Sequence, residues 1–103
     1  SLSKILLQAK KINPHKCSII NIKAPMKGNV VDETKITKCC QKMGWNISSS
    51  VKGKISSTVG EIDIIIENGD IGWEPHIFIL GENPGEVVTK THAFIDAFDG
   101  VAV

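Results

Sequence analysis

The sequence contains no arginine and no tyrosine, and aromatic residues make up only 5% of its 103 positions. Without arginine, the chain lacks the guanidinium group that reads base edges through two parallel hydrogen bonds. Its few aromatics are not interleaved with basic residues, so the stacking surface typical of single-strand binders is also missing. Nucleic-acid binding is therefore disfavoured. It stays an alternative because Lys35, Lys38 and Lys42 would line one face of a helix.

The sequence also lacks any long apolar run. No segment approaches the roughly 20 apolar residues that a membrane-spanning helix needs, and the first residues, SLSKILLQAKK, lack the pattern of a secretory signal. The three cysteines are Cys17, Cys39 and Cys40, an odd number with two neighbours, which does not suggest a disulfide framework. We therefore expect a cytoplasmic protein with reduced thiols and no membrane contact.

Charge is distributed unevenly along the chain. Residues 1–54 hold eleven of the twelve lysines and two acids, a formal charge of +9, whereas residues 55–103 hold one lysine and nine acids, a charge of −8. Such asymmetry is found in proteins that self-associate or bind a charged partner. The alternative is that the two halves interleave in space within one domain, so that their charges neutralise each other locally.

Hydrophobic periodicity predicts three helices. Apolar residues recur at helical spacing in residues 2–9, 36–43 and 87–98. Asp32 is expected to cap the second helix and Gly44 to end it, while Gly100 is expected to end the third. Before the third helix, the strand–glycine–helix stretch HIFILGENPGEVV resembles the start of a phosphate site. Pro84 and the two neighbouring glutamates argue instead for a self-capped helix start that binds no anion.

Strands are predicted at residues 16–24, 45–51, 54–66, 70–80 and 101–103. The dipeptides Lys52-Gly53 and Asn68-Gly69 are expected to form hairpin turns. The resulting order is α-β-α-β-β-β-α-β, in a single domain spanning residues 1–103. It predicts the α+β class: a two-layer sandwich with a mostly antiparallel sheet, helices on one face and a ferredoxin-like character.

The Asn68-Gly69 turn determines which side chains would meet across the sheet. A two-residue turn places Glu61 opposite His76 and pairs Ile66 with Ile71 and Ile64 with Trp73. Strict pairing of this kind would put Phe78 and Leu80 on the acidic face of the sheet. We therefore expect an irregularity near residues 72–75, where Pro75 cannot donate a ladder hydrogen bond.

Chemically interesting residues are few. Cys39 and Cys40 lie within the apolar stripe of the second helix, so core packing is the favoured interpretation, and no zinc-type spacing or EF-hand loop occurs. No serine lies in a nucleophile motif. A histidine beside carboxylates can transfer protons, and this singles out Trp73, Glu74, His76 and Glu61 as candidate ligand-binding residues.

The sequence alone favours a non-enzymatic binding or regulatory module that acts as a homo-oligomer and takes a small-molecule ligand. We expect it to need no metal and no cofactor. Two other hypotheses remain. The first is a small acid/base enzyme that uses His76 with Glu61 or Glu74, and the second is a lysine-dependent nucleic-acid binder.

Overall fold

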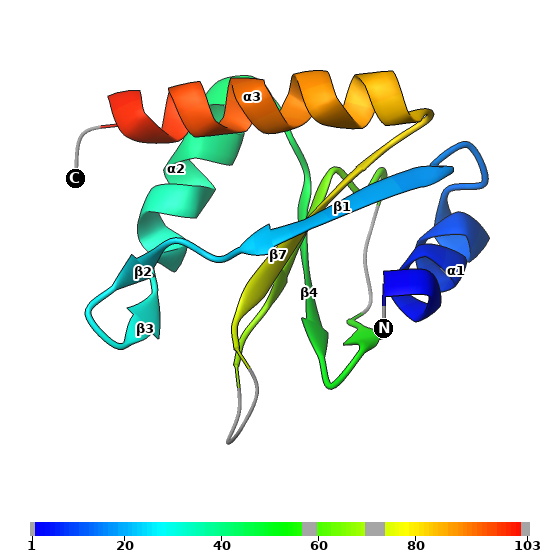
Figure 1. Ribbon diagram of the computed structural model, residues 1–103, viewed down its shortest axis with the longest axis horizontal. Helices are drawn as coiled ribbons and strands as arrows, with labels where there is room; N and C mark the ends of the chain where they lie inside the picture. Colours follow the sequence, from blue (N-terminus) through cyan, green and yellow to red (C-terminus); the bar gives the residue numbers. More distant parts are fainter. Residues whose placement is uncertain (1, 57–59, 70–73, 102–103) are drawn as a thin grey trace.

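The computed structural model describes residues 2–56, 60–69 and 74–101, and it contains three helices and seven strands (Figure 1). The helices are α1 (Leu2–Ile12), α2 (Glu33–Met43) and α3 (Pro84–Gly100). The strands are β1 (Ser18–Lys23), β2 (Met26–Lys27), β3 (Val30–Val31), β4 (Ile47–Val51), β5 (Lys54–Ile55), β6 (Ile64–Glu67) and β7 (His76–Gly81).

Five strands form one sheet in the order β1-β7-β6-β4-β5, and β2 pairs with β3 in a separate hairpin. Within the large sheet only the β4–β6 pair is parallel, and the other three pairs are antiparallel. The predicted α+β class with a mostly antiparallel sheet is therefore confirmed. The β2–β3 hairpin was not predicted, because its strands are too short to show an alternating pattern.

The central strands β6 and β7 are buried on both faces of the sheet, since helices cover both. Helices α2 and α3 lie on one face, as predicted, whereas α1, which was expected on the same face, lies against the other (Figure 1). Alternate residues of the two strands supply the two cores. The core under α2 and α3 contains Ile64, Ile66, Ile77, Ile79, Cys39, Cys40 and Phe94. The core under α1 contains Ile5, Ala9, Ile62, Ile65, Phe78 and Leu80.

Burial of Cys39 and Cys40 confirms the packing role predicted for them, because both residues are 0% exposed. Loss of solvation raises the pKa of the Cys40 thiol to about 12, and burial also raises the pKa of Cys39. Both thiols are therefore protonated at neutral pH. Cys17 is exposed at the surface.

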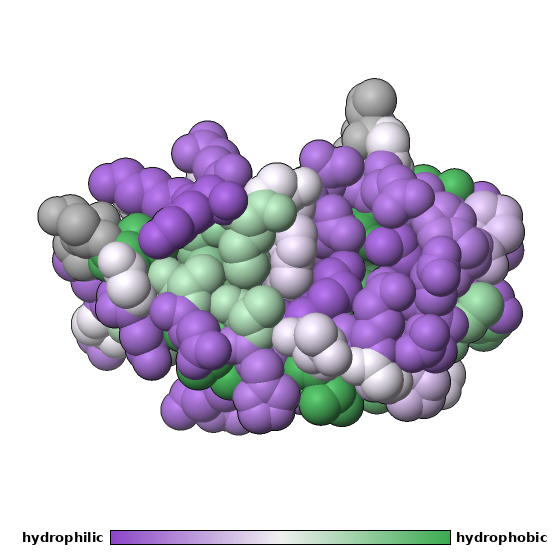
Figure 2. All heavy atoms as spheres, turned by 90° about the horizontal axis from the view of Figure 1, so that it is seen from above, coloured by the Kyte–Doolittle hydropathy of each residue, from purple (hydrophilic) through white to green (hydrophobic). Residues whose placement is uncertain are grey.

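Hydrophilic side chains cover most of the face that α3 crosses, and apolar ones show between them (Figure 2).

The helix ends follow the predicted capping signals. The Asp32 carboxylate accepts the Lys35 N–H at 3.3 Å, and Gly44 ends α2 in the left-handed conformation with φ 72°. At the start of α3, the Asn83 side chain accepts the Glu86 N–H at 2.8 Å. The Glu86 carboxylate in turn accepts the Glu82 N–H at 3.2 Å, an arrangement close to a capping box.

The sequence correctly predicted the β4–β5 hairpin. Val51 pairs with Lys54, and Lys52 and Gly53 both adopt positive φ, at 50° and 80°. The single long strand predicted over residues 54–66 is wrong. β5 ends at Ile55 on one side of β4, and β6 begins at Ile64 on the other side, parallel to β4. The two strands are therefore neighbours of β4 on opposite sides and do not form one strand.

The two-residue turn predicted at Asn68-Gly69 is also wrong. Glu67 pairs with His76, so residues 68–75 connect β6 to β7. This longer connection shifts the register, and Ile66 pairs with Ile77 and Ile64 with Ile79. Phe78 and Leu80 stay on the face of Ile65, as a two-residue turn would also have placed them, because the register moves by an even number of residues. They are buried there without any bulge in the described pairing because α1 covers that face. The irregularity expected at residues 72–75 falls largely outside the described residues, as does the terminal strand expected at 101–103.

Candidate functional site

Two pockets open at the end of the sheet where β6 ends and β7 begins. Consecutive residues contribute to them, because Glu67 lines one pocket and Asn68 lines the other. Successive side chains of an extended segment point to opposite faces of a sheet. The pockets therefore lie on the two sides of the same strand end, one beside α2 and the other beside α1.

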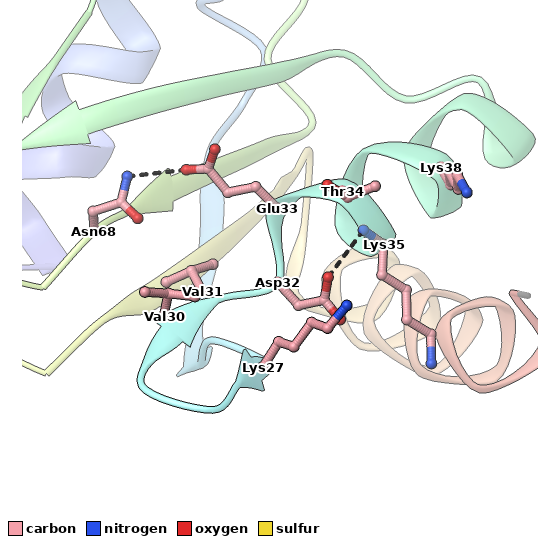
Figure 3. A pocket seen from close by; sticks show the side chains of 9 residues that line it. All are labelled: Lys27, Val30, Val31, Asp32, Glu33, Thr34, Lys35, Lys38 and Asn68. Atoms are coloured by element: carbon pink, nitrogen blue, oxygen red, sulfur yellow. Dashed lines mark hydrogen bonds between the residues drawn. The ribbon is translucent and has the colours of Figure 1, made fainter. Parts of the chain in front are cut away.

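The first pocket, which we call the α2 pocket, has a volume of about 430 Å³. It lies between the β2–β3 hairpin and the start of α2, and its lining side chains are drawn in Figure 3. They are Lys27, Val30, Val31, Asp32, Glu33, Thr34, Lys35, Lys38 and Asn68.

Both acids of the α2 pocket are engaged in hydrogen bonds within the protein. Asp32 caps α2, and the Glu33 carboxylate accepts a hydrogen bond from the Asn68 amide at 3.1 Å (Figure 3). The Lys35 ammonium lies 4.4 Å from the centre of the Phe98 ring, a cation–π distance. With three lysines against two engaged carboxylates, the pocket suits an anionic group.

The second pocket, which we call the α1 pocket, has a volume of about 400 Å³. Sheet register brings its polar side chains together, because Asn21 pairs with Phe78 and Glu67 pairs with His76 across neighbouring strands. The start of α1 and the β4–β5 turn complete the wall. The lining residues are Leu2, Lys4, Ile5, Asn21, Lys52, Gly53, Glu67, Glu74, His76 and Phe78.

Glu67 is the buried acid of the α1 pocket, with only 8% of its surface exposed. Its Oε1 atom accepts two hydrogen bonds, from the Gly53 N–H at 2.8 Å and from the Ser50 hydroxyl at 3.2 Å. These bonds tie the end of β6 to the β4–β5 turn. They also fix the carboxylate in one orientation beside the pocket.

A cluster of charged residues lies at the opposite end of β6. The Asp63 carboxylate accepts the Asn46 N–H at 2.9 Å and contacts the ammonium groups of Lys90 at 3.0 Å and Lys16 at 3.4 Å. Burial alone would raise the pKa of Asp63, but the Asn46 hydrogen bond and the two lysines together lower it. Lys90 also donates to the Leu80 carbonyl at 2.6 Å. We call Asp63, Lys16 and Lys90 the Asp63 cluster.

The sequence profile of the family described as "Thiamine-phosphate synthase ThiN" matches residues 1–93. The chain belongs to the ThiN family. The match covers both pockets, the whole sheet and most of α3, so the family assignment applies to the fold described above.

Two solved structures share the fold of this ThiN-family chain. One is the C-terminal domain of phosphomethylpyrimidine kinase, with a TM-score of 0.71 and 23% identity over 90% of this chain and 59% of that one. The other is the C-terminal domain of protein MJ0236, with a TM-score of 0.66 and 26% identity over 96% of this chain and 58% of that one. The chain thus spans about three-fifths of the length of each. No curated protein matches it in sequence.

These similarities correct the interpretation reached from the sequence. A non-enzymatic binding or regulatory module of unknown function is wrong, because the ThiN family is a family of thiamine-phosphate synthases. That interpretation relied on the absence of a recognisable catalytic motif. A site whose residues come from separate strands and turns leaves no such motif in the sequence.

The structure separates the residues that the sequence proposed for a site in this ThiN-family chain. Glu74 and His76 line the α1 pocket together, and Trp73 lies outside the described residues. Glu61 does not face His76. It contacts the His15 imidazole at 2.5 Å, and this hydrogen bond, with Lys16, lowers the pKa of Glu61. The longer β6–β7 connection explains the change, since it brings Glu67 opposite His76 instead.

Sequence reasoning missed Glu67 and the β2–β3 side of the α2 pocket. The segment IIIE would have given a signal, because a charged residue that directly follows a fully apolar strand lies at the end of that strand, where sites are often built.

The basic residues 1–54 and the acidic residues 55–103 do not form two fully separate surfaces. Ion pairs join them at His15–Glu61, Lys16–Asp63 and Lys23–Glu74.

Within residues 2–56, 60–69 and 74–101, no three His, Cys, Asp or Glu side chains are grouped as a metal ion would require. None of the helices in the same part of the chain combines the length and apolarity needed to cross a bilayer.

Proposed function

We propose that this chain forms part of a thiamine-phosphate synthase and binds its substrates at the end of the sheet where the two pockets open. The family match over residues 1–93 carries this proposal. Because the chain spans about three-fifths of the similar solved chains, the complete activity is proposed for the protein that contains this domain.

The chemistry of the named product supports the proposed location. Thiamine phosphate is an aminopyrimidine joined through a methylene group to a thiazolium ring that carries a phosphate ester. A site that makes it must hold a phosphate and two flat heterocycles. The three lysines of the α2 pocket suit the phosphate because they outnumber the two carboxylates of the pocket, both of which are held by hydrogen bonds within the protein. A volume of about 430 Å³ is in the range of small-molecule sites.

The proposal is tested by incubating the purified protein that contains this domain with the aminopyrimidine that carries a diphosphate on its methylene carbon and with the phosphorylated thiazole. The thiazole nitrogen bonds to the methylene carbon as pyrophosphate leaves, and thiamine phosphate is measured by liquid chromatography. We expect product to form. Replacing Lys38 with Gln removes one positive charge from the α2 pocket and is expected to raise the KM of the phosphorylated thiazole about tenfold, equivalent to one charge-assisted contact.

The matched control is Lys42→Gln. Lys42 lies on the same helix, one turn further along, and does not line the α2 pocket. We expect this variant to leave the KM of the pyrimidine and the KM of the phosphorylated thiazole unchanged. A complete absence of product would contradict the proposed function. Product formation with equal effects of Lys38→Gln and Lys42→Gln would contradict the assignment of the phosphate to the α2 pocket.

Self-association and a cytoplasmic location remain proposals drawn from the sequence. The exposed apolar residues of α1 and α3 support self-association, with Leu7 at 63% and Val88 at 51% exposure. Cys17, Cys39 and Cys40 are all free thiols, which agrees with a reducing compartment. Sedimentation of the purified protein over a range of concentrations tests the first, and fractionation of the native host tests the second.

A further inference from the structure

Strand β1 forms one edge of the sheet (Figure 1), and its outer row of backbone groups has no hydrogen-bond partner among the described residues. The direction of each group follows from the ladder with β7. The Ala24 N–H donates to the Pro75 carbonyl at 3.2 Å and extends the β1–β7 register by one residue. Because hydrogen-bonded pairs alternate along an antiparallel ladder, the even-numbered residues of β1 bond to β7. The N–H and C=O groups of Ile19, Asn21 and Lys23 therefore point away from the sheet.

The opposite edge of the sheet is closed by a side chain of the protein itself. Strand β5 has only two residues, and the Gln8 side chain of α1 lies against it. The Gln8 amide oxygen accepts the Ile55 N–H at 3.0 Å, and the amide nitrogen donates to the Gly53 carbonyl at 2.6 Å. Short strands and covering groups of this kind protect sheet edges from further pairing. Strand β1 has six residues, no proline and no bulge in its pairing with β7, so it is the edge that can accept another strand.

Apolar side chains border the open edge on the face that α3 covers. Val88 and Ile95 are 51% and 46% exposed, and their spacing of seven residues places them on the same side of α3. Val88 and Ile20 line a groove of about 370 Å³ beside β1. The helix packs over both β1 and β7, since Phe94 shares a core with Ile20 and Ile77. Unpaired backbone groups and exposed apolar side chains thus lie next to each other along β1.

We propose that β1 pairs in antiparallel direction with β1 of a second copy of this chain, around a two-fold axis at Asn21, so that the two five-stranded sheets become continuous. This interface specifies the self-association proposed above and does not depend on the proposed reaction. Outward-pointing residues must face each other to form the hydrogen bonds, so Asn21 lies opposite the partner's Asn21 and Ile19 lies opposite the partner's Lys23. The Asn21 amide both donates and accepts, which makes this central pair self-complementary.

Charge and spacing favour this arrangement between two copies. Lys23 is the only charged residue of β1, and its ammonium group contacts the Glu74 carboxylate at 3.6 Å. In the proposed register the two copies of Lys23 lie four residues apart along the interface, about 13 Å, which exceeds the Debye length at physiological ionic strength. Adjacent strands are about 4.8 Å apart, so two α3 helices that each cover β1 and β7 lie roughly 10 Å apart, a distance typical of packed helices. Val88 and Ile95 supply apolar contact between them.

Cysteine crosslinking tests the register of the interface. In a Cys17→Ser background, Asn21→Cys places two thiols across the axis with a Cα separation of about 5.5 Å, within the range of a disulfide. We expect mild oxidation of the purified protein to produce a covalent dimer, since Cys39 and Cys40 are buried and do not compete. Ser49→Cys in the same background is the matched control. Ser49 is also an exposed strand residue, but it lies on β4, away from the β1 edge, and should give no covalent dimer.

The Asn21→Pro variant tests the hydrogen bonds themselves. Proline removes the outward N–H and leaves the β1–β7 ladder intact, and edge strands tolerate proline at such positions. In sedimentation equilibrium we expect the Kd of the dimer to rise at least about tenfold, because two donors are lost across the symmetric interface. Asn21→Gln keeps the N–H and the side-chain amide, and it is expected to keep the wild-type Kd within about threefold.

The outcomes separate this interface from the broader proposals. A protein that stays monomeric at every concentration would overturn both the interface and the self-association. A dimer in which Asn21→Cys forms no more covalent product than Ser49→Cys would overturn the interface alone, whether or not the proline variant folds. Neither measurement involves thiamine phosphate, so the proposed reaction can fail while the interface stands.

Discussion

Replacing Asp63 with Asn is expected to show how strongly the Asp63 cluster stabilises the fold. Asn has the same shape and keeps one acceptor for the Asn46 N–H, but it removes the negative charge between two lysines. The ammonium groups of Lys16 and Lys90 are then left close together, on side chains that are only 5% and 13% exposed. Removing one partner from a buried charge pair leaves the other charge uncompensated, which is the main cost.

The expected loss is smaller than for an isolated buried pair, which is about 3–5 kcal/mol. Lys16 keeps a contact with Glu61 at 3.4 Å, and Lys90 keeps the Leu80 carbonyl and lies 4.9 Å from the centre of the Trp45 ring. We therefore expect the free energy of unfolding to fall by about 2–3 kcal/mol. For a domain of this size, that corresponds to a melting temperature lower by roughly 10–20 °C.

Urea denaturation followed by circular dichroism measures the effect, and its pH dependence tests the cause. The pKa of Asp63 is lowered from 3.8, so the stabilisation that its carboxylate provides is fully present above that value and is lost as the pH falls through the folded-state pKa. The difference between wild type and variant should be largest at neutral pH and should vanish in acid. A difference that persists unchanged in acid would refute the electrostatic explanation. Glu61→Gln is the control, since Glu61 is half-exposed and should change stability little.

Three further predictions concern packing and thiol reactivity. The buried Ser48 hydroxyl has no hydrogen-bond partner among the described residues, so Ser48→Ala should raise the free energy of unfolding by about 1 kcal/mol in urea denaturation. Gly81→Ala would place a Cβ 2.9 Å from the Glu86 carboxylate oxygen and 3.0 Å from a Val87 methyl group. Glu86 can move away but then gives up its hydrogen bond to the Glu82 N–H, so we expect a loss of about 1 kcal/mol, whereas Gly100→Ala, with no atom within 4 Å, should not destabilise the fold. A thiol reagent should modify Cys17 in the folded protein but reach Cys40 only in denaturant, as titration of released chromophore would show.

Local signals predicted the helix ends and the first hairpin because each depends on a few neighbouring residues. Asp32, Gly44 and Asn83 act through their own backbone geometry or a side chain that reaches three residues along the chain. The Lys52-Gly53 turn likewise needs only two residues with positive φ. Nothing elsewhere in the chain has to be known for these predictions to be right.

Strand register could not be predicted in the same way. Asn68-Gly69 is a good turn sequence, yet the pairing places Ile64, Ile65 and Ile66 opposite Ile79, Phe78 and Ile77. The apolar part of β6 thus lies beside the apolar part of β7, and the connection spans eight residues, from 68 to 75. Burial of Phe78 under α1 depends on a helix whose last residue, Ile12, lies 66 residues earlier in the chain. The same long-range effect explains why His76 pairs with Glu67 and not with the predicted Glu61. Of these two acids, only Glu67 lines the α1 pocket beside His76.

The two ends of the sheet differ in how their buried charges are satisfied, and the α1 and α2 pockets lie at the end that holds Glu67. At the Asp63 end, the carboxylate has a backbone donor and two ammonium partners. Such a cluster is complete and offers no group to a ligand. At the Glu67 end, the carboxylate accepts the Gly53 N–H and the Ser50 hydroxyl at its Oε1 atom, and the side chain lines the α1 pocket. An acid held by a turn N–H and a serine hydroxyl at the wall of a pocket stays within reach of a bound molecule, whereas the acid of the Asp63 cluster is enclosed by its own partners.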